Sequence, residues 1–123
     1  MTQDVESPAG PHIRSVDEVP ADTRRGGEVR TLLSPKTVGS TSGFMGVATI
    51  PAGDWISEHY HPYSEEFIYV VRGEVHFDQP EGKAVLKAGD SLLIPGGVEH
   101  QASTPVASEV LDVFTPMRED YAV

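Results

Sequence analysis

The chain has no cysteine, few basic residues and no long apolar stretch, and each absence excludes a class of protein. Without cysteine, neither a disulfide nor a thiolate metal site can form. Only 9 lysine and arginine residues stand against 19 acidic ones, and the formal charge of −10 disfavours nucleic acid and anionic membranes as partners. No apolar run approaches the roughly 20 residues that span a bilayer, and residues 1–10 lack the features of a secretory signal. We therefore expect a cytoplasmic protein whose ligand is a small molecule.

The 123 residues suffice for one domain that buries its own core. Residues 1–27 are polar, with three prolines and a Gly26-Gly27 pair, and we predict that they form an N-terminal arm. Residues 28–123 alternate short β-like runs with turns, and no stretch of helical length keeps a 3.6-residue period. The clearest predicted strands are residues 29–33, 44–50, 67–71, 74–77, 91–94 and 110–114, with turns at 34–35, 51–54, 80–82 and 88–90. The pattern predicts a single all-β domain, a β-sandwich or jelly-roll barrel.

Histidines and glutamates stand at fixed offsets from two groups of glycines. The residues concerned are Gly53, His59, His61, Glu65, Glu66 and Gly73 in the first block, and Gly89, Pro95, Gly96, Gly97 and His100 in the second. His59 and His61 are two residues apart, so on a strand they project from one face and can reach one ion. Imidazole nitrogens with a carboxylate suit a borderline divalent transition metal, and zinc, iron, nickel and manganese all remain candidates.

Alternation alone does not decide which glutamate faces inward. Glu66 has the same parity as Ile68 and Val70. Glu65 has the parity of a second apolar set, which consists of Phe67, Tyr69 and Val71. Both faces of this predicted strand are therefore apolar, and parity leaves both glutamates open.

The two blocks resemble the two conserved motifs of the cupin superfamily. Gly53, His59, His61, Glu66 and Gly73 match the first motif, and Gly89, Pro95, Gly97 and His100 match the second. The resemblance implies a cupin jelly-roll barrel with one metal ion held by His59, His61, Glu66 and His100. The interval from Glu66 to Gly73 selects Glu66 over Glu65. Thr104 replaces the asparagine that often closes the second motif, at a position that is not a metal ligand.

A longer stretch, residues 24–77, carries a more specific resemblance. It looks like the small cupins of actinobacterial aromatic (type II) polyketide synthases, of the tetracenomycin, spore-pigment and resistomycin type. Three segments carry it: 24–35 (RRGGEVRTLLSP), 41–46 (TSGFMG) and 59–66 (HYHPYSEE). Members of that group are described as polyketide cyclases or as quinone-forming monooxygenases. The resemblance implies a polyketide substrate, free or bound to a carrier protein.

Three functions follow as hypotheses. The first is a cyclase, in which the metal stabilises the enolate of a poly-β-ketone during aldol closure and aromatisation, with the four ligand residues carrying the catalytic role. The second is an iron-dependent oxygenase on a similar aromatic substrate. The third is a non-catalytic cupin that binds the polyketide or stabilises the synthase.

Other residues receive simpler interpretations. His76 alternates with Glu74 and Asp78, so we expect it on a solvated or interface face rather than at the metal. Phe44, Met45 and Trp55 are expected to fill the core, with a substrate pocket as the alternative. Open sheet edges tend to be covered, so we also expect a homodimer to which the arm and residues 29–33 contribute.

Overall fold

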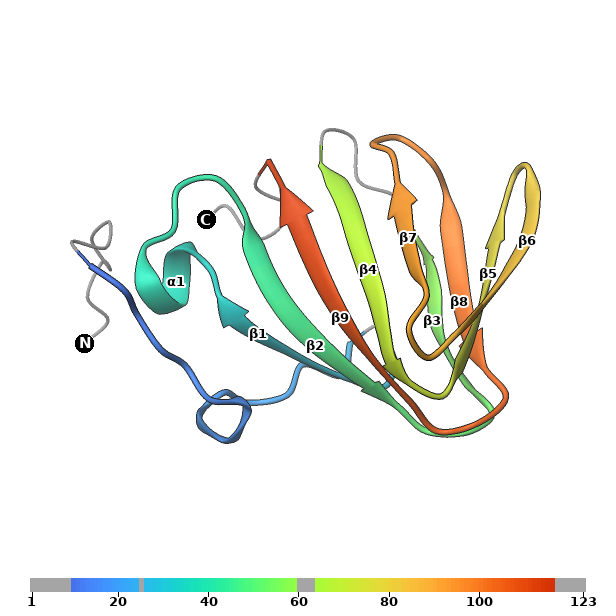
Figure 1. Cartoon of the computed structure of the whole chain (residues 1–123), viewed down its shortest axis with the longest axis horizontal. Helices are drawn as coiled ribbons and strands as arrows, with labels where there is room; N and C mark the ends of the chain where they lie inside the picture. Colours follow the sequence, from blue (N-terminus) through green and yellow to red (C-terminus); the bar gives the residue numbers. More distant parts are fainter. Residues whose placement is uncertain (1–9, 25, 60–63, 117–123) are drawn as a thin grey trace.

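The computed structural model describes residues 10–24, 26–59 and 64–116, except that the side chains of residues 57–59 are not described (Figure 1). These residues form a β-sandwich of two antiparallel sheets, as the sequence predicts. The first is a 5-stranded sheet in the order β1-β2-β9-β4-β7, and the second is a 4-stranded sheet in the order β3-β8-β5-β6. The strands are β1 (Glu28–Leu33), β2 (Phe44–Ile50), β3 (Asp54–His59), β4 (Glu65–Arg72), β5 (Glu74–Gln79), β6 (Gly82–Lys87), β7 (Ser91–Ile94), β8 (His100–Thr104) and β9 (Ser108–Thr115).

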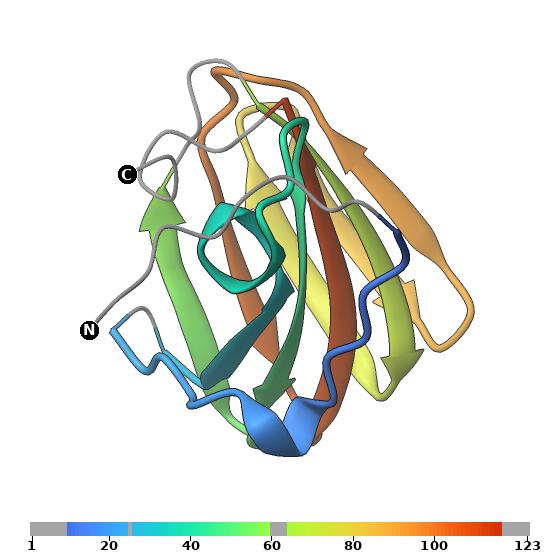
Figure 2. The same ribbon diagram turned by 90° about the vertical axis from the view of Figure 1, so that its left-hand side faces the viewer.

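Alternation of buried and exposed residues sets the faces of the central strands. In β2 every second residue from Phe44 to Ile50 is buried, and in β4 the buried residues are Glu66, Ile68 and Val70. The buried faces of both sheets meet in one core, to which Ile50, Val70, Val75, Phe77, Ile94 and Ala102 belong. Strands β4 and β8 lie in different sheets that face each other, so their inward positions are turned toward the same core (Figures 1 and 2).

Six of the strands were expected from the sequence, and three were not. The additional strands are β3, β6 and β8. In β8 the inward positions are His100, Ala102 and Thr104. Polar and small residues at these positions hide the apolar alternation that identifies a strand. The turns expected at residues 51–54, 80–82 and 88–90 are confirmed.

The turn expected at Ser34-Pro35 is wrong, because Ser34 is the N-cap of the short helix α1 (Pro35–Val38) and Pro35 is its first residue. The Ser34 hydroxyl accepts a hydrogen bond from the Thr37 amide at 3.2 Å, which caps the helix. Pro35 occupies the first turn, and Gly39 ends the helix in the left-handed conformation with φ of 72°. Serine and proline before a short helix therefore give the same local signal as a turn.

The described part of the N-terminal segment lies beside β1 and α1 (Figures 1 and 2). It contains the 3-10 helix η1 (Val16–Glu18), and Asp22 forms an isolated β-bridge with Val29 of β1. Arg14 donates a hydrogen bond to the Thr37 carbonyl at 3.0 Å, which ties the segment to α1. Within the described ranges, no helix has the length and hydropathy that crossing a bilayer requires.

Candidate functional site

Glu66 faces the interior of the sandwich from β4. It is 6% exposed, whereas its neighbour Glu65 is exposed. The register pairs Glu66 with Phe114 of β9 on one side and with Ile94 of β7 on the other, and both partners are buried. Of the two adjacent glutamates, Glu66 is thus the one that can act within the core.

His100 approaches Glu66 from the opposite sheet. It begins β8, is 2% exposed, and its Nε2 atom lies 3.2 Å from Glu66 Oε1. On the other side of the ring, Nδ1 lies 3.1 Å from the carbonyl oxygen of Val98. A carbonyl oxygen only accepts, so Nδ1 carries a proton and donates a hydrogen bond to the Val98 carbonyl oxygen. Nε2 is then the atom that is available to a metal ion, and the Val98 contact fixes the ring orientation.

The Glu66–His100 pair fits two ligands of one metal ion. Each group presents a lone pair to the same point, unless His100 carries a second proton. Two ligand atoms bound at roughly 2.1 Å and at angles between octahedral and tetrahedral lie about 3.0–3.4 Å apart. The Nε2–Oε1 distance of 3.2 Å falls within that interval. The donor set and its spacing are therefore compatible with a shared cation.

Of the other two predicted ligands, His59 and His61, the structure describes only the backbone of His59. His59 ends β3, and its backbone is the direct partner of His100 in the β3–β8 ladder. The ladder has an irregularity between Ile56 and His59, so that His59 rather than Glu58 stands opposite His100. The side chain of His59 and the whole of His61 lie outside the described residues. Among the described side chains, no group of three or more metal-binding residues is found.

The pKa of His100 is raised above its ordinary value of 6.5. Burial alone lowers it, but the hydrogen bond and negative charge of Glu66 and the Val98 carbonyl together outweigh burial. In the metal-free protein the imidazolium is thus favoured by the same carboxylate that would share a metal with it. A metal ion must displace this proton before Nε2 can bind.

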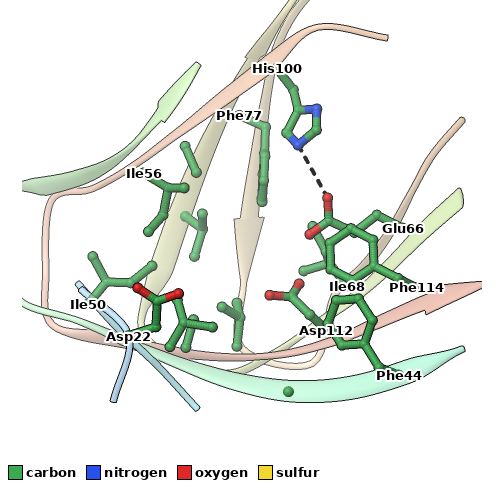
Figure 3. Close-up of a pocket in the computed structure, with 16 residues that line it drawn as sticks. Asp22, Phe44, Ile50, Ile56, Glu66, Ile68, Phe77, His100, Asp112 and Phe114 are labelled. Carbon is green, nitrogen blue, oxygen red and sulfur yellow. Dashed lines mark ion pairs between the residues drawn. The ribbon is translucent and has the colours of Figure 1, made fainter. Parts of the chain in front are cut away.

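A largely apolar pocket extends from the Glu66–His100 pair into the sandwich (Figure 3). Its volume is about 70 Å³, several times what one buried water requires. Both sheets contribute apolar walls, which include Phe44, Ile50, Ile56, Ile68, Phe77 and Phe114. Phe44 and Phe114 stack on each other, with ring centroids 4.6 Å apart. Such a pocket suits a flat, mostly apolar guest with a polar group at the metal end.

Two aspartates that line the pocket, Asp22 and Asp112, were not predicted from the sequence. Asp112 lies on the inward face of β9, at the alternate position between Val110 and Phe114. Its Oδ1 atom is buried. Burial raises the pKa of Asp112 well above 3.8, and the charge of Glu66 and a hydrogen bond with it raise the pKa further. A single acidic residue within an otherwise apolar predicted strand was the signal that could have identified Asp112. Asp22 lies in the predicted arm, where nothing in the sequence marked it.

The remaining expectations have mixed outcomes. His76 is half-buried, and its Nε2 atom lies 2.6 Å from Oε2 of Glu74, which is not one of the predicted ligands. Trp55 is 61% exposed, and its expected place in the core is wrong. Phe44 both packs in the core and lines the pocket. Thr104 is buried and donates a hydrogen bond to the Pro51 carbonyl at 2.9 Å, which is a structural role.

Comparison with known proteins shows which family and which relatives this chain is similar to. The family model of the cupin domain matches residues 46–114. The chain is 54% identical over 89 residues to Protein SchB of Streptomyces halstedii, covering 72% of this chain and 64% of SchB. It is 50% identical over 104 residues to Polyketide synthase CurC of Streptomyces cyaneus, covering 85% of this chain and 68% of CurC. The chain thus spans about two thirds of the length of these two relatives.

A solved structure gives the same architecture. The polyketide cyclase RemF from Streptomyces resistomycificus has a TM-score of 0.74 to this chain, covering 89% of this chain and 82% of RemF. At 21% identity, this similarity shows a shared fold. The predicted jelly-roll architecture and the resemblance inferred from the two motifs are confirmed. Because the family model matches more than half of its length, the chain belongs to the cupin domain family.

Proposed function

We propose that this chain is a metal-dependent cupin of aromatic polyketide biosynthesis that promotes aldol cyclisation and aromatisation of a poly-β-ketone. The observation that supports this most directly is the position of the Glu66–His100 pair, with 3.2 Å between Nε2 and Oε1, at one end of a mostly apolar pocket. Its relatedness to Polyketide synthase CurC supports the substrate class. Since the chain spans about two thirds of that relative, the reaction is a proposal for this chain itself.

The proposed metal ligands are His59, His61, Glu66 and His100. Glu66 and His100 would supply one oxygen and one imidazole nitrogen from opposite sheets, and the register of β3 with β8 brings the backbone of His59 to the same end. When bound there, a divalent zinc, iron, nickel or manganese ion is a Lewis acid that stabilises an enolate and polarises the carbonyl under attack.

The pocket supplies the second part of the mechanism. Phe44, Phe114 and Ile68 form an apolar wall beside Glu66, so a poly-β-ketone that reaches the Glu66–His100 pair loses water contact along its chain. Confinement restricts a flexible chain to folded arrangements in which a nucleophilic carbon lies near its carbonyl. Such an entropic contribution can reach several kcal/mol. The apolar walls would therefore select the ring-closing arrangement.

The experiment that tests the proposal combines this chain with a reconstituted polyketide synthase that forms a defined poly-β-ketone. Adding the metal-loaded chain should increase the correctly cyclised aromatic product under anaerobic conditions. Glu66→Gln and His100→Ala should lose bound metal and reduce this effect at least about a hundredfold, because Lewis-acid stabilisation is worth several kcal/mol. His76→Ala is the matched control, since His76 pairs with Glu74 outside the pocket lining.

Two outcomes contradict the cyclase proposal. Oxygen uptake in proportion to product, with no turnover under anaerobic conditions, indicates an oxygenase. Unchanged product ratios with His100→Ala, despite lost metal, indicate a binding protein in which the metal site has no catalytic role.

A further inference from the structure

Asp112 is a half-buried residue that interacts with Glu66, and one of its carboxyl oxygens, Oδ1, has no evident structural role. It faces the interior from the middle of β9, where its direct partners are Gly46 on β2 and Ile68 on β4. Neither side chain can form a hydrogen bond with a carboxyl group. Within the described residues, Oδ1 of Asp112 is buried and has no hydrogen-bond partner. Burying such an atom destabilises a fold, so its presence calls for a role that the folded chain alone does not supply.

The surroundings of Asp112 define the chemistry of a partner. Its carboxyl group points into the pocket, next to the stacked rings of Phe44 and Phe114 (Figure 3). Gly46 opposite contributes no side chain, so the wall at this point is flat backbone. A guest that fits here has a flat apolar body and one group that can donate a hydrogen bond to a carboxyl oxygen.

Asp22, the other aspartate of the pocket, is different. Arg24 donates hydrogen bonds to both of its oxygens, from Nε at 3.0 Å and from Nη2 at 2.6 Å. Its carboxylate is thus held by the chain itself. Asp112 is therefore the aspartate to which a guest could add a missing hydrogen bond.

We propose that Asp112 is a specificity-determining residue, whose carboxyl group accepts a hydrogen bond from a ring or enol hydroxyl of the polyketide while the Phe44–Phe114 pair contacts the flat body. This deepens the proposed function and rests on it. The proposed metal site at the Glu66–His100 pair would hold one end of the guest, and Asp112 fixes its rotation within the pocket. The residue thereby selects which carbons meet during ring closure.

The test uses two small probes, 2-naphthol and naphthalene, with the full chain loaded with zinc. Both probes have the same flat body, and only 2-naphthol has a hydroxyl group. We expect Asp112→Val to reduce the preference for 2-naphthol over naphthalene about three- to tenfold, as calorimetry would measure, which corresponds to one net hydrogen bond. Asp112→Asn keeps a carbonyl acceptor and should retain most of the preference. Asp78→Asn, at a half-exposed carboxylate on β5, is the control and should leave it unchanged.

A second measurement needs no variant, in case Asp112→Val does not fold. The carboxyl ¹³C resonance of Asp112 in the wild-type chain should shift on addition of 2-naphthol and much less with naphthalene. An unchanged preference in folded, zinc-containing Asp112→Val, or a saturating 2-naphthol titration without that shift, overturns the proposal. Loss of the preference in Asp22→Val instead of Asp112→Val also overturns it. Probe binding requires no turnover, so this result is independent of whether the cyclase assay succeeds.

Discussion

His100 and Glu66 belong to opposite sheets, and the 3.2 Å between Nε2 and Oε1 makes their interaction a link across the sandwich. Both residues are almost fully buried, so their charges are poorly screened by solvent. The Val98 carbonyl fixes the proton on Nδ1 and directs Nε2 at Glu66. In the metal-free chain this relationship stabilises a proton, and we propose that in the loaded chain a metal ion takes the proton's place.

The first prediction concerns the pKa of His100 in the metal-free chain. Wild-type His100 should titrate above 6.5, because the hydrogen bond and charge of Glu66 outweigh burial. Glu66→Gln removes the charge and leaves burial, so the pKa should fall relative to the wild type. NMR titration of the imidazole C–H resonance measures both values. As a control, Glu65→Gln changes an exposed neighbour and should leave the pKa of His100 unchanged. Equal pKa values of His100 in the wild type and in Glu66→Gln would contradict this account.

The second prediction concerns metal affinity and pH. A metal ion binds the neutral imidazole, and His100 is protonated below its raised pKa. Apparent zinc affinity should therefore decrease by about tenfold per pH unit below that pKa for this one displaced proton. Competition with a chelator whose own pH dependence is known provides the measurement. An affinity that does not change between pH 7 and pH 5 would exclude His100 as a ligand.

The third prediction is that Asp112 lowers the stability of the metal-free chain as pH rises. Its pKa in the folded chain is well above 3.8, whereas in the unfolded chain it is near 3.8. Above pH 3.8 the unfolded chain releases a proton that the folded chain keeps, so stability falls until the pH passes the raised pKa. Asp112→Asn cannot titrate. Its free energy of unfolding should exceed that of the wild type by roughly 1–3 kcal/mol at neutral pH, and by less near pH 4.

Urea denaturation of metal-free protein at several pH values measures this difference. The control is Asp78→Asn, a half-exposed carboxyl, which should change stability by no more than about 0.5 kcal/mol at any of these pH values. A less stable Asp112→Asn at neutral pH would mean that Asp112 serves the fold rather than the guest.

The sequence predicted the class of fold and most of the strands, but it could not identify the interior face of β4. Phe67, Tyr69 and Val71 are each more than 40% exposed, so the outer face of this strand is apolar as well. An apolar outer face removes the contrast on which alternation depends. Only the spacing of the cupin motif separated Glu66 from Glu65, and burial in the structure agrees with that choice.

The candidate site shows a second limit of sequence reasoning. His100 and Glu66 were predicted because their spacing from glycines resembles the cupin motifs, and such spacing is a local property of the chain. Asp112 has no such spacing, and its significance depends on contacts that β9 makes with β2 and β4 on either side. A residue whose role arises from its neighbours in three dimensions carries only a weak signal in one sequence, here a lone acid between apolar residues.

The fourth prediction is self-association. β1 is an edge strand of the 5-stranded sheet, and the described part of the arm contacts it through the Asp22–Val29 bridge. We expect this edge and the arm to contribute to a homodimer, since exposed edges are usually covered. Light scattering should then give twice the chain mass of 13.3 kDa. A mass of one chain across micromolar to millimolar concentrations would remove the dimer.

The fifth prediction compares two glycines with nearly the same positive φ angle. Gly73 has φ of +92° and Gly89 has φ of +93°, a region that other residues rarely adopt. A Cβ at Gly73 would lie 2.7 Å from both the Ala107 carbonyl oxygen and the Ser108 Cα, whereas a Cβ at Gly89 would meet nothing within 4 Å. Gly89→Ala should therefore destabilise the chain by about 1–2 kcal/mol through backbone strain alone.

Gly73→Ala should add a steric penalty of a further 1–3 kcal/mol, roughly, because backbone atoms at the start of β9 must move. Ser108 is completely buried there, and its hydroxyl accepts a hydrogen bond from the Glu74 amide at 3.0 Å, so movement would also disturb the start of β5. Thermal or urea denaturation of the two variants gives the difference directly. The two glycines have nearly the same φ, so backbone strain should be similar in both variants. Equal losses of stability would therefore show that Ala107 and Ser108 lie too far from Gly73 to clash with a Cβ atom.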